Sequence, residues 1–290
     1  MKPPLFDYLA PVSVEEAIAA RARYQSSALL AGGQSLIPAL NFRISHPEAV
    51  IDLKGIESLR GVELQGSEIV IGAMARHREV ELDEAIFKAN PLIRETLGHV
   101  AHIVIRNRGT VVGSLAHGDA AAEMPALFLA TGGSVTARGP GGSREIAAGE
   151  LYRFHLTTSL EPDELVTEAR IPALPARTGW SFQEFARRRG DYALAGVCAL
   201  ITLEASGACQ GARLSACGIA STPVRLVKAE EVLTGTSLET ETVNEAGRAA
   251  CAHVTAPDDN QTTSAFRKQL VQTLVTRTIT RALARARARL

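Results

Sequence analysis

The sequence predicts an α+β fold in two domains, and three features of the chain support this prediction. Strand-length apolar runs and helical segments alternate through the first half of the chain. The stretch 172–179 carries two prolines and a glycine without apolar periodicity, which indicates a boundary. Beyond it, three strand patterns follow one another before the pattern becomes helical. We therefore expect an N-terminal domain over 1–176 and a C-terminal domain over 177–290.

The first subdomain, 1–56, is predicted to be a small α/β unit. Ser13 and Glu16 have the spacing of a capping box, so a helix is expected to begin after Ser13. The runs 28–31 and 49–53 are short and apolar, which is typical of buried strands.

The second subdomain, 57–176, mixes strands and helices in this prediction. Its expected elements are strands over 68–72 and 164–171, a helix over 124–130, and a hairpin around 139–142. Pro125 suits the first turn of that helix and Gly132 suits its end. The apolar stretch 96–104 is expected to form a helix or an extended segment.

The C-terminal domain is expected to be an antiparallel meander followed by helices. The predicted strands are 181–185, 196–204 and 210–220, and the predicted helices are 225–234, 238–252 and 263–289. After Asp259 the chain has seven basic residues and no acidic one. Arg277, Arg281 and Arg285 share one helical face, which is interpreted as a solvated surface, with a docking surface for an acidic partner as the alternative.

Composition excludes several classes of function. Lysine plus arginine and aspartate plus glutamate both number 31, and aromatic residues are few, so nucleic acid is not expected as a partner. No apolar run approaches the roughly 20 residues of a membrane span, and the start lacks a signal-peptide core. We expect a cytoplasmic protein. The cysteines, which are expected to be buried free thiols without metal, are Cys198, Cys209, Cys217 and Cys251.

Two glycine-containing loops are the main functional signal. They are Leu-Ala-Gly-Gly-Gln-Ser-Leu at 30–36 and Arg-Asn-Arg-Gly-Thr-Val-Val-Gly-Ser at 106–114. A phosphate needs converging N–H donors and small residues that allow close approach, and Ser35 and Ser114 add hydroxyl donors. Neither loop has the Rossmann or Walker spacing. The first loop alone favours a plain strand-to-helix turn, but the two together predict a pyrophosphate cradle and hence a dinucleotide cofactor.

Further motifs carry a resemblance to a known family. They are Phe6-Asp7-Tyr8, Ala31 to Leu36, His46-Pro47 before 50–53, Arg106 to Thr110, Gly113 to His117, Glu123 to Ala126, and Arg187 to Ala193. In this order and combination they resemble the FAD-binding medium subunit of molybdenum hydroxylases, a family that includes carbon monoxide dehydrogenase and xanthine dehydrogenase. The resemblance covers nearly the whole chain.

The resemblance implies a fold of the vanillyl-alcohol-oxidase type. Two α/β subdomains would hold FAD between them, and a third domain of antiparallel sheet and helices would close over the flavin. The chain would pass electrons from 2Fe-2S clusters of a small partner subunit through FAD to an external acceptor. The molybdenum cofactor would belong to a large partner subunit. No catalytic side chain and no metal site is expected on this chain.

The resemblance also implies a set of cofactor-binding residues. They are Leu30, Ala31, Gly32, Gly33, Gln34, Ser35, Leu36, Val100, Ala101, Thr110, Gly113, Ser114, His117, Glu123, Leu165, Val166 and Tyr192. Both loops would hold the pyrophosphate, and Glu123 would accept a hydrogen bond from an FAD hydroxyl, assigned to the adenosine ribose. Leu165 and Val166 would lie along the isoalloxazine, with Tyr192 near the ring. Gln183 and Glu184 stand where some relatives have a lysine near the flavin.

Two other functions remain open at this point. One is a free-standing flavin oxidase of the same fold, which would need a base or a covalent flavin attachment that the sequence does not offer in a recognisable pattern. The other is a non-catalytic nucleotide-binding module. At single residues, Glu123 could instead complement a helix dipole, and Tyr192 could be a core aromatic.

Overall fold

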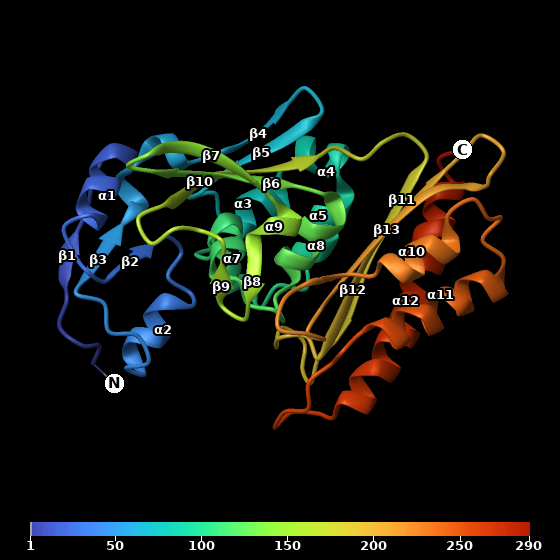
Figure 1. Ribbon diagram of the computed structural model, residues 1–290. Coiled ribbons are helices and arrows are strands. Elements are labelled where there is room, and N and C mark those ends of the chain that lie inside the picture. The colour runs from blue at the N-terminus through green and yellow to red at the C-terminus, as the bar shows by residue number, and fades with distance from the viewer. Residues whose placement is uncertain (1) are drawn as a thin grey trace.

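The computed structural model describes residues 2–290, which begin with a small parallel sheet (Figure 1). Its strand order is β1-β3-β2. The elements of this unit are β1 Asp7–Leu9, α1 Val14–Arg21, β2 Ser27–Leu30, α2 Leu36–Asn41 and β3 Ala49–Asp52. The Ser13 hydroxyl accepts a hydrogen bond from the Glu16 N–H at 3.1 Å, which confirms the predicted helix start. Helices connect the parallel strands, as this pairing requires.

An antiparallel sheet of five strands follows, with the order β4-β5-β10-β6-β7. Its strands are β4 Val62–Gln65, β5 Glu68–Gly72, β6 Ser134–Gly139, β7 Gly142–Ala147 and β10 Leu165–Pro172. The predicted hairpin around 139–142 is confirmed as the β6–β7 turn. The central strand β10 pairs with β5 on one side and β6 on the other.

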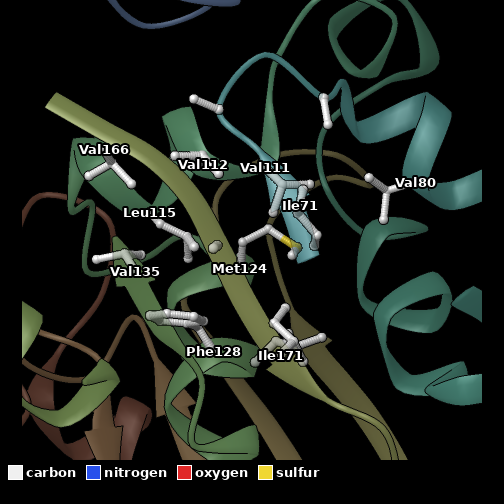
Figure 2. Packing of buried hydrophobic residues seen from close by; sticks show 14 of the residues in the cluster. Ile71, Val80, Val111, Val112, Leu115, Met124, Phe128, Val135, Val166 and Ile171 are labelled. Atoms are coloured by element: carbon white, nitrogen blue, oxygen red, sulfur yellow. The ribbon is translucent and has the colours of Figure 1, made fainter. Parts of the chain in front are cut away.

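Helices cover one face of this sheet (Figure 1). They are α3 His77–Leu82, α4 Glu84–Ala89, α5 Pro91–Leu97, α6 Ile103–Arg106, α7 Val111–His117, α8 Glu123–Thr131 and α9 Ala148–Leu151. Two short helices, η1 Leu53–Gly55 and η2 Glu57–Leu59, and the ribbon of β8 Tyr152–Phe154 with β9 Thr157–Thr158 complete this part. Figure 2 shows Met124 and Phe128 of α8 packed between Leu115 of α7 and the strands that carry Ile71 and Ile171.

The expected element over 96–104 is corrected by the structure. α5 ends at Leu97, and a short turn separates it from α6. The reason is local: Gly98 caps α5, and Ala101 has a φ of +44°, which no helix or strand accommodates.

The C-terminal part is an antiparallel sheet covered by helices, as predicted, but the sheet has a fourth strand where the helix 225–234 was expected to begin. The strands are β11 Thr178–Phe185, β12 Ala195–Leu203, β13 Cys209–Cys217 and β14 Val224–Arg225, and the helices are α10 Val227–Leu233, α11 Thr240–His253 and α12 Ser264–Arg287. Side chains of β12 alternate between two cores: Cys198 and Leu200 face the N-terminal part, whereas Val197, Ala199 and Ile201 face α12. Burial on both faces explains the continuous apolar run of this strand.

The basic face of the last helix is partly an internal contact: Arg277 and Arg281 are exposed, as expected for a solvated face, whereas Arg285 is held by other parts of the chain. Arg285 Nη1 donates to Glu95 Oε2 at 2.5 Å and to the Trp180 carbonyl oxygen at 2.7 Å. Its guanidinium also lies over the Trp180 ring. Arg289 donates to the Thr178 carbonyl oxygen at 3.1 Å. These arginines therefore tie α12 to β11 and α5 because carbonyls and a carboxylate face them.

The cysteines agree with the expectation of free thiols. Cys198, Cys209 and Cys217 are buried and Cys251 is half-buried, and all four are free. Among the helices of residues 2–290, none combines the length and apolar character needed to cross a lipid bilayer.

The packing of α12 on β11 leads to a stability prediction. A Cβ atom at Gly179 would collide with the Ala282 carbonyl oxygen in α12, whereas one at Gly211 in β13 would meet nothing within 4 Å. We expect Gly179→Ala to lower the free energy of unfolding by about 1–3 kcal/mol, as overpacking does. Gly211→Ala is the matched control and should change it by less than about 0.5 kcal/mol. Denaturant unfolding checks both, and equal stability of the two variants would contradict this account of the packing.

Candidate functional site

The two glycine-containing loops predicted from the sequence lie against each other. The first, 31–35, joins β2 to α2, and the second, 107–110, joins α6 to α7. A Cβ atom at Gly32 would collide with the Arg108 carbonyl oxygen and would lie 2.6 Å from the Gly109 Cα. Glycine at position 32 is therefore required because two backbones touch there, and not only to leave room for a phosphate.

The first loop presents backbone donors that the protein does not use. Gly33 has a φ of +72°, in the left-handed region that favours glycine. In residues 2–290, no protein acceptor takes a hydrogen bond from the N–H groups of Gly32, Gly33 or Gln34. The Ser35 hydroxyl precedes α2 without capping it. Unused N–H groups beside a small hydroxyl are the donors that a phosphate binds.

The second loop is held by its neighbours on both sides. The His77 N–H donates to the Gly109 carbonyl oxygen at 2.9 Å, which attaches the loop to the start of α3. Thr110 caps α7, since its Oγ1 accepts from the Gly113 N–H at 3.1 Å. A Cβ at Gly113 would lie 2.5 Å from that oxygen, so the cap itself requires glycine there.

Both loops line one cleft of about 770 Å³, within the size range of cofactor sites. The structure brings almost all of the predicted cofactor-binding residues to this cleft. They are Ala31, Gly32, Gly33, Gln34, Ser35, Leu36, Val100, Ala101, Thr110, Gly113, Ser114, His117, Glu123, Leu165, Val166 and Tyr192. Leu30 is the exception, because its side chain packs behind Gly33, 3.1 Å from the Cβ position of that residue, and not into the cleft.

Irregularities of the backbone position two pairs of neighbouring predicted site residues, Leu165 with Val166 and Val100 with Ala101. Leu165 and Val166 begin β10, and a β-bulge between Val166 and Glu168 shifts the register against β6. A β-bulge changes the local direction of a strand and its side chains, and this bulge lies where β10 meets the cleft. Val100 and Ala101 form the turn before α6, and the Arg106 guanidinium donates to both of their carbonyl oxygens, at 3.0 and 3.2 Å.

Tyr192 reaches the cleft from the segment between β11 and β12. Its side chain is 53% exposed, so the alternative of a core aromatic is wrong. Partial burial, with Asp119 and Glu123 nearby, raises the pKa of Tyr192 to about 12. Ser35 of the first loop lies beside its hydroxyl. The C-terminal part therefore closes over the loop that the N-terminal part provides.

Glu123 is the first residue of α8 and is 5% exposed. Burial, with Glu184 and Asp119 nearby, raises the pKa of Glu123 to about 8. The side chain is thus largely protonated at neutral pH and can donate as well as accept a hydrogen bond. Glu123 does begin a helix, but a protonated carboxyl group does not supply the negative charge that the dipole alternative requires.

The two histidines of the cleft remain uncharged at neutral pH. His117 ends α7, and burial lowers its pKa. His77, the first residue of α3, is buried against the second loop and lines the cleft, which nothing in the local sequence indicates. Neither ring nitrogen of His77 has a hydrogen-bond partner within the protein. Burial, together with Arg106, lowers the pKa of His77 to about 4. Two buried ring nitrogens at a cleft that lack hydrogen-bond partners in the protein indicate that a bound ligand supplies those partners.

Other residues of the site were also missed in the sequence. Arg21 and Asp119 line the cleft, and Arg106 holds the turn at Val100. No local pattern identifies these residues, because each acts on a segment distant in sequence. Within residues 2–290, no three His, Cys, Asp or Glu side chains are grouped to hold a metal ion.

Comparison with known proteins relates the chain to one group of flavoproteins. The family model described as "FAD binding domain in molybdopterin dehydrogenase" matches residues 4–174, and "CO dehydrogenase flavoprotein C-terminal domain" matches residues 180–282.

Full-length relatives share the whole arrangement. The chain is 40% identical to subunit alpha of the 6-hydroxypseudooxynicotine dehydrogenase complex of Paenarthrobacter nicotinovorans, over 99% of this chain and 97% of the relative. It is 35% identical to the carbon monoxide dehydrogenase medium chain of Afipia carboxidovorans, over 96% and 97%. A solved carbon monoxide dehydrogenase from Hydrogenophaga pseudoflava superposes with a TM-score of 0.95 at 34% identity, over 98% of this chain and 99% of that chain.

The buried imidazole leads to a prediction about acid stability. His77 has a pKa of about 4 in the folded chain and about 6.5 when unfolded, so the unfolded state binds more protons between these values. The contribution of the neutral His77 imidazole to the free energy of unfolding is therefore fully present above about pH 6.5. Roughly 3 kcal/mol of this contribution is lost as the pH drops to about 4. His77→Gln should remove this part of the loss in cofactor-free protein, as denaturant unfolding at several pH values will show. Replacing the exposed His253 with Gln is the control, and identical pH profiles for wild type and His77→Gln would refute the assignment.

Proposed function

This chain belongs to the family of FAD-binding medium subunits of molybdenum hydroxylases, and we propose that it holds one FAD in the cleft and relays electrons through it. The electrons would come from a 2Fe-2S cluster of a partner subunit and leave to an external acceptor. The single observation that carries this proposal is the backbone contact at Gly32, which joins two phosphate-binding loops in one cleft. We propose 1–176, with subdomains 1–56 and 57–176, as the FAD-binding domain and 177–290 as the C-terminal flavoprotein domain.

The residues of the cleft fit FAD. The unused N–H groups of Gly32, Gly33 and Gln34 would bind the diphosphate, and the unpartnered nitrogens of His77 offer a donor and an acceptor behind the second loop. We assign Tyr192 to the flavin end. Since Glu123 lies near enough to Tyr192 to affect its pKa, we place Glu123 at the same end and not at the adenosine ribose.

When bound, FAD supplies the redox chemistry, and the chain supplies binding, orientation and environment. The loops would fix the diphosphate, and Leu165 and Val166 would set the plane on which the ring lies. Tyr192 would limit the access of water to one side of the cleft. Such a role needs no nucleophile or catalytic base on this chain.

Members of this family are subunits of multi-subunit oxidoreductase complexes. For this chain we propose a large subunit with the molybdenum cofactor and a small subunit with 2Fe-2S clusters as partners. We also propose a cytoplasmic location, supported by four free cysteines of which three are buried, since free thiols persist in reducing compartments.

Purification of the complex tests the function directly. FAD should be released on denaturation, and the flavin absorption of the native complex should bleach when the substrate of the large subunit is added. A complex without flavin, or flavin that stays oxidised while the iron–sulfur absorption changes, would overturn the proposal. Substrate turnover by the isolated chain would favour a free-standing oxidase instead.

The loop contact leads to a prediction about cofactor affinity. Gly32→Ala places a Cβ against the second loop, so the loops must separate and their N–H groups diverge. We expect FAD to bind at least about tenfold more weakly, which corresponds to roughly 1.4 kcal/mol. Gly149→Ala is the control, because a Cβ there meets nothing within 4 Å. Fluorescence titration with FAD measures both, and wild-type affinity in Gly32→Ala would show that the contact does not shape the site.

A further inference from the structure

Three carboxyl groups converge near the end of the cleft where Tyr192 lies. Glu123 begins α8, Asp119 follows α7, and Glu184 stands near the end of β11. Among the ion pairs formed within residues 2–290, none involves Glu123 or Asp119. A carboxyl group that is buried beside other carboxylates and has no cation of its own favours the neutral form.

Glu184 is the member of this group that contacts an imidazole. Its Oε1 lies 3.2 Å from His99 Nδ1, and its side chain is 7% exposed. Its other oxygen, Oε2, is buried and has no hydrogen-bond partner. His99 is 37% exposed and packs edge-on against Phe182, so the imidazole connects Glu184 to solvent.

Glu123 is the member that holds the proton. It is 5% exposed and lines the cleft, yet it lacks the imidazole partner that Glu184 has. The titratable groups that face it are Glu184 from β11, Asp119 from the loop after α7, Tyr192 from the β11–β12 segment and Cys217 from β13. None of these groups forms a cation, and burial keeps the Cys217 thiol and the Tyr192 phenol in their neutral, protonated forms.

We propose that Glu123, buried beside Glu184 and Asp119, binds the cofactor as a neutral carboxylic acid that donates a hydrogen bond to FAD. This inference rests on the proposed FAD site. The pKa of about 8 for Glu123, which burial raises most and Glu184 raises further, agrees with it. A neutral acid beside an ionised one is a known way to obtain a carboxyl donor at neutral pH.

The consequence is a pH-dependent affinity for FAD. Above about pH 8, Glu123 ionises, loses its donor and places a charge beside a ligand whose diphosphate is already negative. If only the protonated form binds, affinity falls in proportion to the protonated fraction. The dissociation constant at pH 9 should then be about tenfold higher than at pH 7.

The experiment is a titration of FAD into the deflavinated full-length chain, followed by flavin fluorescence between about pH 6.5 and about pH 9.5. Glu123→Gln keeps a donor amide that cannot ionise, so it should bind FAD with a flat pH profile above neutrality. Glu184→Gln removes the adjacent charge, so the pKa of Glu123 should drop and the loss of affinity should begin at lower pH. Any titration of FAD itself appears equally in Glu123→Gln and is subtracted.

Glu164→Gln is the matched control. Glu164 also lines the cleft, but its carboxylate pairs with Arg144 at 2.7 Å, which holds its pKa below the usual range. This variant should keep the wild-type pH midpoint, whatever its affinity. Circular dichroism at each pH confirms that the variants are folded.

Infrared spectroscopy of the cofactor-free chain supplies a second readout. A protonated-carboxyl C=O band should be present at pH 7 in wild type, disappear with an apparent pKa of about 8, and be absent in Glu123→Gln. A flat wild-type affinity profile, an unchanged fall in Glu123→Gln, or no such band would overturn the inference. Failure of the wild type to bind FAD at any pH would instead overturn the proposed function.

Discussion

The burial of α8 between two sheets is the constraint on which the arrangement of the molecule depends. All nine of its residues are buried, and Phe128 packs beneath the five-stranded sheet. On the other side, Ser215 Oγ and Arg213 Nε of β13 donate to carbonyl oxygens of Ala126 and Ala130, at 2.5 and 2.6 Å. A helix held by a core on one face and by hydrogen bonds on the other cannot tilt, so it fixes the C-terminal sheet relative to the loops.

This fixed position determines what reaches the cleft. The β11–β12 segment extends from the C-terminal sheet toward the first glycine loop, and Tyr192 arrives beside Ser35. Glu123 begins the same buried helix, so the carboxyl group faces the cleft while the rest of α8 is core. The packing of α8 between the N-terminal and C-terminal parts therefore determines which residues reach the cleft.

The cleft combines two electrostatic environments. The loops offer backbone N–H donors, which suit phosphate oxygens without introducing full positive charges. Near Tyr192, the carboxyl groups of Glu123, Asp119 and Glu184 lie close together, and Glu184 contacts the His99 imidazole. A chain that binds a negatively charged dinucleotide next to carboxyl groups must keep part of this acidity protonated or compensated, which is the physical basis of the inference about Glu123.

The sequence by itself determined the types of most elements and, through the family resemblance, sixteen of the residues that line the cleft. Capping at Ser13, the proline and glycine that bound α8, and the alternation of β12 are local signals, because neighbouring residues decide them. Only the tertiary structure decided which distant groups meet: Gly32 with Arg108, His77 behind Gly109, Arg285 with Glu95, and Glu123 near Glu184. These pairs depend on the orientation of packed elements, and periodicity in a sequence records which face of an element is buried but not what it is buried against.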